Sequence, residues 1–277
     1  MDRGTAHELE ELALAVSTPT TYRHIVCEDE GTVALVTMNR PERRNALSLE
    51  HMQELTAAIA EIGERREASV VILRGNGPAY CAGHDLAEMV GRDDAFYAEL
   101  FLACTVLMET IQRVPQPVIA EVHGVATAAG CQLVATCDLA VAAETARFAT
   151  PGVKIGLFCS TPMVALTRNV CRKKALEMLL TGEALGADDA RIAGLVNRVV
   201  PEDELRSATL ALAHTIAAAS PQVVAIGKEA YYRQIELPVA DAYELTRSVM
   251  AGNAAAADAQ EGMGAFLEKR APVWGGR

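Results

Sequence analysis

Short apolar runs alternate with longer amphipathic stretches over most of this chain. The runs are brief and rich in β-branched residues, which predicts buried strands at 32–38, 70–74, 118–122, 138–142 and 195–200. Between them, apolar positions recur at helical spacing, and caps or breakers mark the ends of these stretches. One predicted helix is capped by Ser48 and runs to about Arg65, and a second, long helix ends at about Arg113, before Pro115. Another helix is predicted to begin at Pro162, with Ser160 and Thr161 as its caps. The remaining predicted helices cover 129–137, 173–180 and 187–193, the last ended by Gly194.

This alternation predicts an α/β fold built as a spiral of β-β-α units. The spiral core is expected over 21–200, after an N-terminal extension at 1–20 that is typical of a short helix or a partly ordered segment. From Pro201 onward the strands cease and the chain becomes Ala-rich and helical. Residues 201–277 are therefore predicted to form a helical appendage whose apolar positions need a surface to cover.

Composition narrows the class of protein. The chain has 277 residues, 51% of them hydrophobic, and a net charge of −11, which disfavours a nucleic-acid surface because phosphate binding needs concentrated Lys and Arg. Seven cysteines without a C-x-x-C pair suggest neither a metal site nor a disulfide framework. No apolar run approaches the roughly 20 residues that span a bilayer, so no membrane partner is expected. The first 16 residues carry four acids, unlike a transit peptide, which predicts a cytoplasmic protein.

Two small-residue turns carry the candidate chemistry. The turn from Gly124 to Gly130 follows a predicted strand and opens a helix, so the N–H groups near Ala129 are unpaired and lie at the positive end of the helix dipole. The segment Tyr80–Leu86 is a second strand-to-helix turn with a glycine in it. Two such turns facing each other supply two N–H donors to one carbonyl oxygen, the minimum for stabilising an enolate or a tetrahedral anion.

With these turns the chain resembles the crotonase, or enoyl-CoA hydratase/isomerase, family. The matching motifs are NRPERRNALS, YCAGHDL, HGVATAAGCQL, CDLAVA, RFATPGVKIGL and GMGAFLEKRAPVW, spread from residue 39 to 274. The resemblance implies an acyl-CoA thioester as the partner, with CoA as part of the substrate and no permanently bound cofactor. It also implies that the helical tail covers the mouth of the site and assembles a homotrimer or a dimer of trimers.

The resemblance assigns roles residue by residue. The two oxyanion donors would be the backbone amides of His84 and Ala129. Hydratases of the family carry two glutamates that hold a water between them, and this chain has Gln132 and Gly152 at those positions. Neither residue can titrate, and each lost acid or base costs about 10²- to 10⁴-fold. Hydration is therefore expected to be slow or absent, while the acyl-CoA cradle survives.

Two side chains are candidates to replace the acids. The His84 ring is either an acid–base group beside the carbonyl or a pocket wall. The Cys159 thiol is either an acid or nucleophile or, more simply, a small buried group. Asp85 and Asp138 are interpreted as turn-binding acids, and His123 as a turn residue. By resemblance, the CoA portion would contact Arg44, Ala46, Ala82 and Lys228, and the substrate-binding set also includes Asp85 and Leu86. For Arg44 and Lys228, ordinary surface charge is the competing interpretation.

Four functions stay open at this point. One is a CoA-ester enzyme that uses the oxyanion hole and an unconventional group, for example in thioester hydrolysis. A second is a residual hydratase in which Gln132 positions water. A third is a methylmalonyl-CoA-type decarboxylase, because the A-G-H-D sequence resembles that branch, although that branch has a tyrosine near the position of Cys159. The fourth is a non-catalytic acyl-CoA sensor or scaffold.

Overall fold

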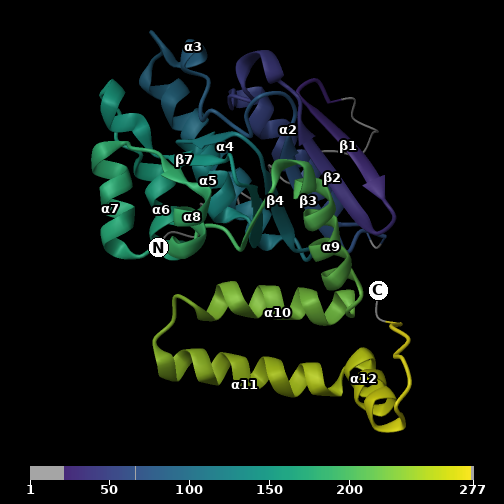
Figure 1. The fold of residues 1–277 in the computed structure, drawn as a ribbon. Coiled ribbons are helices and arrows are strands. Elements are labelled where there is room, and N and C mark those ends of the chain that lie inside the picture. Colours follow the sequence, from purple (N-terminus) through teal and green to yellow (C-terminus); the bar gives the residue numbers. More distant parts are fainter. Residues whose placement is uncertain (1–21, 66, 276–277) are drawn as a thin grey trace.

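The computed structural model describes residues 22–65 and 67–275. The N-terminal extension expected at 1–20 lies outside these residues. The described part is mixed α/β, as predicted, with helices packed on both faces of a main sheet and a helical layer below it (Figure 1).

The main sheet has six strands, which lie in the order β1-β2-β3-β4-β6-β9. All neighbours pair in parallel except β1 and β2. Parallel strands bury both faces, which explains their continuous apolar sequences. The strands are β1 (Ile25–Glu30), β2 (Val33–Met38), β3 (Val70–Gly75), β4 (Val118–Val122), β6 (Leu139–Ala143) and β9 (Arg198–Val200).

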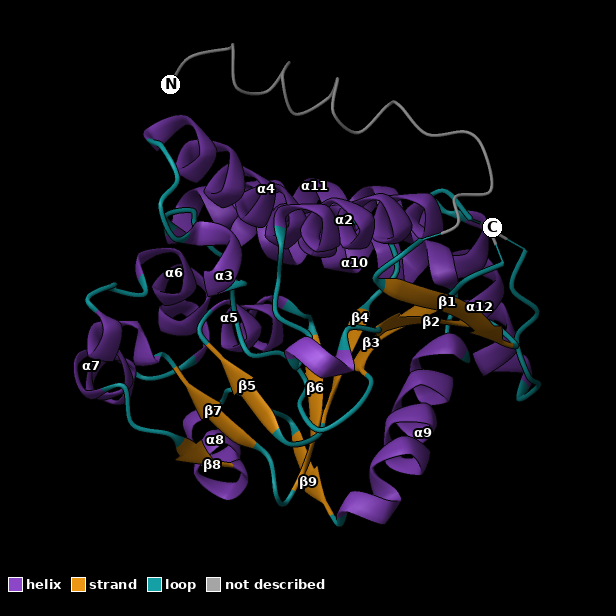
Figure 2. Ribbon diagram, turned by 90° about the horizontal axis from the view of Figure 1, so that it is seen from above, coloured by secondary structure: helices purple, strands orange, loops and turns teal. Residues whose placement is uncertain are grey.

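A second sheet of three short strands lies beside the first (Figure 2). It consists of β5 (Val125–Thr127), β7 (Arg147–Ala149) and β8 (Leu185–Gly186). The chain alternates between the sheets, because β4 leads to β5, β6 to β7, and β8 through a helix to β9. This alternation is the spiral that the sequence predicts, and it carries each strand-to-helix turn to the same region of the molecule.

The helices that bear on the site pack on one face of the main sheet. They are α2 (Leu49–Gly63), α4 (Asp94–Arg113) and α5 (Ala129–Thr136), and their buried positions join the larger core cluster. The Ser48 hydroxyl caps α2 by accepting the His51 N–H, as the sequence indicates. The remaining segments of the spiral are η1 (Pro41–Arg43), α3 (Leu86–Met89), η2 (Pro151–Ile155), α6 (Ser160–Asn169), α7 (Arg172–Thr181) and α8 (Ala187–Ala193).

Helix α9 (Leu205–Ala217) covers the opposite face of the main sheet, following η3 (Glu202–Glu204). Its Leu205, Leu212 and Ala213 form a second core cluster with strand residues such as Val70 and Ile72. The strands end at residue 200, as predicted, yet α9 packs with the spiral core. The separate helical layer therefore starts at α10, one helix later than the composition change at 201 indicates.

The helical layer consists of α10 (Pro221–Gln234), α11 (Val239–Ala255) and α12 (Ala257–Glu268), drawn below the core in Figure 1. Lys228 fastens α10 to the core. Its ammonium donates to the carbonyls of Ile111 at 2.8 Å and Gln116 at 2.9 Å and pairs with Asp138 at 2.7 Å. These three acceptors match the three protons of the ammonium.

Two predicted element boundaries differ from the structure. Helix α6 begins at Ser160 with Cys159 in the N-cap position and no side-chain cap, so Ser160 and Thr161 are not caps. The strand predicted over 195–200 forms only from residue 198, because the Leu195 N–H donates to the Ala190 carbonyl and closes the end of α8.

Within the described ranges, no single helix is both long and apolar enough to cross a bilayer. Only the pair 202–217 and 221–234 meets that criterion jointly, with a bend of 100° between its halves.

Replacing Lys228 by Met is expected to lower the free energy of unfolding by about 3–5 kcal/mol, because it removes the cation paired with the half-buried Asp138 carboxylate and the donor to two carbonyls. Urea unfolding measures this loss. Lys174 serves as the matched control: it is an exposed lysine paired with Glu177, and Lys174→Met should change stability by no more than about 0.5 kcal/mol. Equal losses in both variants would contradict the structural role of Lys228.

Candidate functional site

The first turn follows β3 and lies against β5. The Cys81 N–H donates to the Val125 carbonyl at 3.1 Å, and the Thr127 N–H donates back to the Cys81 carbonyl at 2.9 Å. Beyond this pairing, Gly83 adopts a φ of +90°, which L side chains rarely tolerate. The chain then turns into α3, whose N-cap is Asp85.

The second turn joins β5 to α5. Ala128, the N-cap of α5, has a φ of 50° and a ψ of −116°, an uncommon conformation for a residue with a Cβ. Its own N–H donates to the Ala149 carbonyl at 2.8 Å. This bond to β7 holds the start of α5 in place, so the strained residue directly precedes the predicted donor Ala129.

The two turns are in contact through their backbones. A Cβ built on Gly83 would lie 3.5 Å from the Ala129 nitrogen and 2.9 Å from the Ala128 Cβ. A Cβ on Gly130 would lie 2.2 Å from the Cys81 carbonyl oxygen, inside van der Waals contact. Glycine at both positions is therefore what allows the turns to approach. The structure therefore places the turn that carries His84 against the turn that carries Ala129.

Among the residues described, neither predicted donor uses its amide: the His84 N–H and the Ala129 N–H donate to no protein acceptor. His84 pairs in parallel fashion with Leu47, a geometry in which its own N–H points away from Leu47. Ala129 is the first residue of α5, where no intrahelical acceptor exists. Two free N–H groups on touching turns can serve one oxygen atom.

Gln132 lies one turn along α5 from Ala129 and is 5% exposed. Its Oε1 accepts from the Cys104 thiol of α4 at an S···O distance of 3.7 Å. Burial raises the pKa of Cys104 to about 12, so the thiol keeps its proton near neutral pH. The pair holds the Gln132 amide in a fixed orientation, but it contains no group that titrates near pH 7.

Gly152 lies in η2 with no room for a side chain. A Cβ there would be 2.5 Å from the Leu157 carbonyl oxygen and 2.9 Å from the Cys159 sulfur. The Gly152 carbonyl also accepts the Leu157 N–H at 2.9 Å, which closes the loop over this position. The loop thus occupies the space in which a glutamate at 152 would begin.

Cys159 is 7% exposed, and burial raises the pKa of its thiol, with the nearby Gly152 backbone opposing that shift. A thiol that keeps its proton is a poor nucleophile. This environment matches the interpretation of Cys159 as a small buried group.

The His84 ring packs edge to face against Phe101 of α4, with 5.4 Å between ring centroids. Burial lowers the pKa of His84 to about 4 against the opposing effect of the Leu47 backbone. Both ring nitrogens are buried, and neither lies in hydrogen-bonding geometry with a described residue. The ring is therefore neutral at pH 7 and a weak base, which favours the pocket-wall interpretation over the acid–base one.

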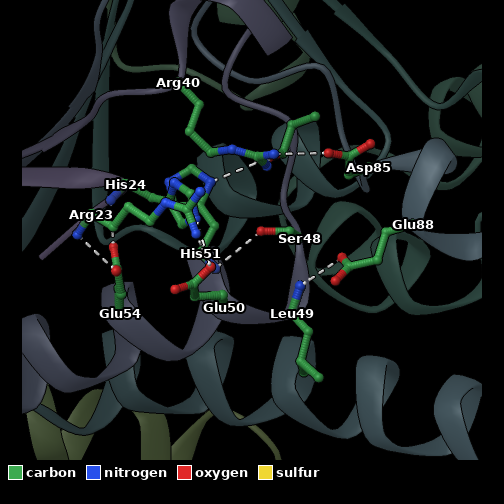
Figure 3. A network of polar contacts seen from close by, with 11 residues as sticks. Arg23, His24, Arg40, Ser48, Leu49, Glu50, His51, Glu54, Asp85 and Glu88 are labelled. Atoms are coloured by element: carbon green, nitrogen blue, oxygen red, sulfur yellow. Dashed lines mark hydrogen bonds and ion pairs between the residues drawn. The ribbon is translucent and has the colours of Figure 1, made fainter.

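Three polar residues that sequence reasoning passed over support the first turn and the segment beside it, and two of them, Arg40 and His51, are labelled in Figure 3. The Arg40 guanidinium pairs with Asp85 at 2.9 Å and donates to the Ala46 carbonyl at 2.5 Å. Buried His51 approaches the same Ala46 carbonyl through Nδ1 at 3.2 Å. Fully buried Asn45 donates to three carbonyls of the loop before the turn, at residues 76, 79 and 80. Arg40 and Asn45 belong to the NRPERRNALS motif and His51 follows it, so this motif is the sequence feature that could have identified them.

The residues predicted to contact CoA divide into two groups. Ala46, Ala82, Asp85 and Leu86 lie on or beside the first turn, and the Ala82 N–H donates to the Arg44 carbonyl at 3.0 Å. Lys228 lies elsewhere: it contacts Asp138 beyond the far end of α5, and its three protons are already used. Within this chain Lys228 has no donor left for a phosphate, so we leave it out of the candidate site.

The predicted turn residues are engaged as expected. Asp85 Oδ1 accepts the Ala87 N–H, Asp138 accepts the Val118 N–H at 2.7 Å, and His123 Nε2 lies 2.8 Å from the Gly77 carbonyl. Each is thus committed to the backbone around it.

A cavity of about 630 Å³ opens at the other end of α5, between α10 and the core. Its lining includes Ala135, Asp138, Arg168, Lys228 and Tyr232. An eight-residue helix is about 12 Å long, so this cavity is separated from the two free amides at the N-terminus of α5. It is not the predicted thioester site.

Comparison with known proteins identifies the class. The family model described as enoyl-CoA hydratase/isomerase matches residues 28–277, and the chain belongs to this family. Among curated relatives, the mitochondrial enoyl-CoA hydratase domain-containing protein 3 of Xenopus laevis is 46% identical over 278 residues, 98% of this chain and 94% of its own. The human protein of that name is 48% identical over 242 residues, 86% of this chain and 79% of its own.

Solved structures agree with this assignment. An enoyl-CoA hydratase from Mycobacterium smegmatis is 50% identical with a TM-score of 0.89, covering 91% of this chain and 99% of its own. The human enoyl-CoA hydratase domain-containing protein 3 is 45% identical with a TM-score of 0.89, covering 91% and 100%. The predicted family and the crotonase fold are confirmed.

The comparisons contradict one expectation. The acid-rich N-terminus predicted a cytoplasmic protein, whereas the relatives from Xenopus laevis, human and mouse are named as mitochondrial. The prediction was wrong because a count of acids in 16 residues is a weak signal for location.

Gly152→Ala is expected to lower the free energy of unfolding by about 1–3 kcal/mol, because the new methyl group overlaps the Leu157 carbonyl. Thermal or urea unfolding measures it. The matched control is Gly227→Ala in α10, where an added Cβ meets no atom within 4 Å, and there alanine should be neutral or stabilise by up to about 1 kcal/mol. A neutral result at 152 would show that the loop gives way.

Acid is expected to destabilise the protein through His51, whose pKa burial lowers to about 4. The unfolded ring takes up a proton at about pH 6.5 and the folded ring only near 4, so stability falls as pH drops through this window. From pH 7 to pH 5 the loss from this residue is about 2 kcal/mol.

Urea unfolding of wild type and His51→Gln at both pH values measures that loss, and the variant should lose less on acidification than wild type. His214→Gln, at an exposed position on α9, is the control and should leave the wild-type pH dependence in place. An unchanged pH dependence in His51→Gln would rule out this account.

Proposed function

We propose that this protein binds an acyl-CoA thioester and stabilises negative charge on its carbonyl oxygen without performing efficient hydration. The observation that carries the proposal is the pair of unused amides, His84 N–H and Ala129 N–H, on two turns in backbone contact. Membership in the enoyl-CoA hydratase/isomerase family supports the CoA ester as the substrate. The proposed ligand enters as substrate, and the proposal needs no resident cofactor.

The positions of the two missing acids support a reaction that does not activate water by a carboxylate. Gln132 cannot take up or release a proton near neutral pH, and Gly152 leaves no room for a longer side chain. The two acids at the first turn are engaged elsewhere: Asp85 pairs with Arg40, and Glu88 accepts the Leu49 N–H at 2.9 Å. Two aligned donors retain roughly 10²- to 10³-fold each in stabilising an oxyanion.

Decarboxylation of a malonyl-type CoA ester is the reaction that these residues suit best. The bond between the α-carbon and the carboxylate breaks, its electron pair enters the thioester enolate, and CO₂ leaves. The enolate oxygen would be held by the two amides, and the α-carbon would then take a proton from water. No base has to remove a proton, so neutral His84 and Gln132 are no obstacle, and they would act as walls.

The helical layer supports a proposed homotrimer or dimer of trimers. Its apolar side chains Met250, Phe266 and Leu267 are 65%, 82% and 80% exposed in the single chain. Side chains of this size and exposure in one layer mark a surface that a partner covers.

Crotonyl-CoA and methylmalonyl-CoA, given to the purified protein in parallel, test the proposal. We expect CO₂ release from methylmalonyl-CoA, and crotonyl-CoA hydration at least about 10²-fold below that of an ordinary hydratase assayed alongside. Hydration at the ordinary rate would refute the proposed consequence of the two missing acids. Tight binding with no turnover of either ester would favour the fourth function, a non-catalytic acyl-CoA sensor or scaffold.

Gln132→Glu tests the residual hydratase within the same assay. If residue 132 faces the reacting carbons, the new carboxyl should raise crotonyl-CoA hydration, though not to the ordinary rate while the second acid is absent. Gln53→Glu, at an exposed position of α2, is the control and should change nothing. No gain from Gln132→Glu would remove residue 132 from the reaction centre.

A further inference from the structure

Residues 40–49 hold the first turn in place through hydrogen bonds and an ion pair, made by both their side chains and their main chain. Arg40 is 13% exposed at its side chain and uses both ends of its guanidinium, one on the Ala46 carbonyl and one on the Asp85 carboxylate. Asp85 directly follows His84, and its second oxygen caps α3 through the Ala87 N–H. Arg40 therefore connects the segment before α2 with the residue beside the proposed oxyanion donor (Figure 3).

Main-chain hydrogen bonds hold the residues on both sides of His84. The Leu47 N–H donates to the Gly83 carbonyl at 2.8 Å, and the Asp85 N–H donates to the Leu47 carbonyl at 3.0 Å. His84 lies between these bonds with its own N–H turned outward. The direction of that N–H thus depends on the separation between Leu47 and Asp85, and the guanidinium of Arg40 spans the neighbouring residues Ala46 and Asp85.

We propose that Arg40 is a positioning residue for the thioester carbonyl, setting the direction of the His84 N–H through Asp85 and Ala46. The proposal rests on the function proposed above. Hydrogen bonds weaken steeply as the donor angle closes, so a small rotation of the turn costs stabilisation of the oxyanion without removing the CoA contacts.

Arginine suits this role because its planar fork presents two donors at fixed separation. A lysine keeps the positive charge, but its three N–H donors share one nitrogen, so it cannot span the Ala46 carbonyl and the Asp85 carboxylate in the same arrangement. Arg40→Lys should therefore loosen the turn while it preserves the local charge. Arg65→Lys is the matched control, since Arg65 also joins a distant carboxylate, Asp29, at 2.7 Å, on the surface near the end of α2.

The experiment uses butyryl-CoA carrying ¹³C at the thioester carbonyl, a saturated ester that has no double bond to hydrate and no carboxylate to lose. Isotope-edited infrared difference spectra report the carbonyl stretch of the bound ester, and titration calorimetry reports its affinity. In wild type the two donors should move the stretch to lower frequency. In Arg40→Lys the downshift should fall by about half, because one of two donors is misaligned, with affinity within about threefold of wild type.

The outcomes separate the two proposals. A wild-type complex with no downshift overturns the proposed function, whatever Arg40 does. A wild-type downshift that Arg40→Lys reproduces in full, as Arg65→Lys should, overturns the role of Arg40 alone.

If Arg40→Lys does not fold, Asp85→Asn is used in the same experiment. The amide keeps the cap on α3 but removes the negative charge that pairs with Arg40. The same partial loss of downshift is then expected, and an unchanged downshift would overturn the role of Arg40. Where both variants fold, the double variant should lose no more than Arg40→Lys alone, since both changes break the Arg40–Asp85 pair.

Discussion

The contact between the backbones of two turns is the constraint on which the candidate site depends. Gly83 and Gly130 bring Cys81, Ala128 and Ala129 within van der Waals distance, and any side chain at either glycine would push the turns apart. The rest of the fold supports this approach: β5 pairs with the first turn, β7 holds Ala128, and Leu47 holds the residues on either side of His84. A site made of main-chain amides is fixed by how the turns pack and is insensitive to the side chain that His84 carries.

Under the proposed function, such a site would hold an anion whatever side chains stand at 132 and 152. The amides are defined by the path of the chain, so substitution at 132 or 152 leaves them in place. At the two positions where the resemblance expects acids, this chain has an amide that Cys104 contacts and a glycine under a closed loop. Under the proposed function, charge stabilisation by the main chain would therefore not depend on proton transfer by a side chain at either position.

The sequence predicted most of the main sheet because parallel strands buried on both faces are continuously apolar, and it located both turns because their glycines are required. It did not reveal the small sheet, whose strands of two or three residues are too short to show a period. Lys228 illustrates a second limit of sequence-based prediction. The residue type alone does not distinguish a lysine that holds a helix against the core from one that binds phosphate. Arg40 and Asn45 were missed because Asp85 and the carbonyls of residues 76, 79 and 80 are distant from them in sequence.

The closed loop over Gly152 also limits how this protein could change. Because the Leu157 carbonyl stands 2.5 Å from where a new Cβ would lie, an acid at 152 needs a shift of the loop as well as a substitution. The backbone between 152 and 159 would have to move to make room for the side chain. Under the proposed function, engineering hydration into this chain therefore requires a change in the main chain here, which no exchange of one side chain supplies.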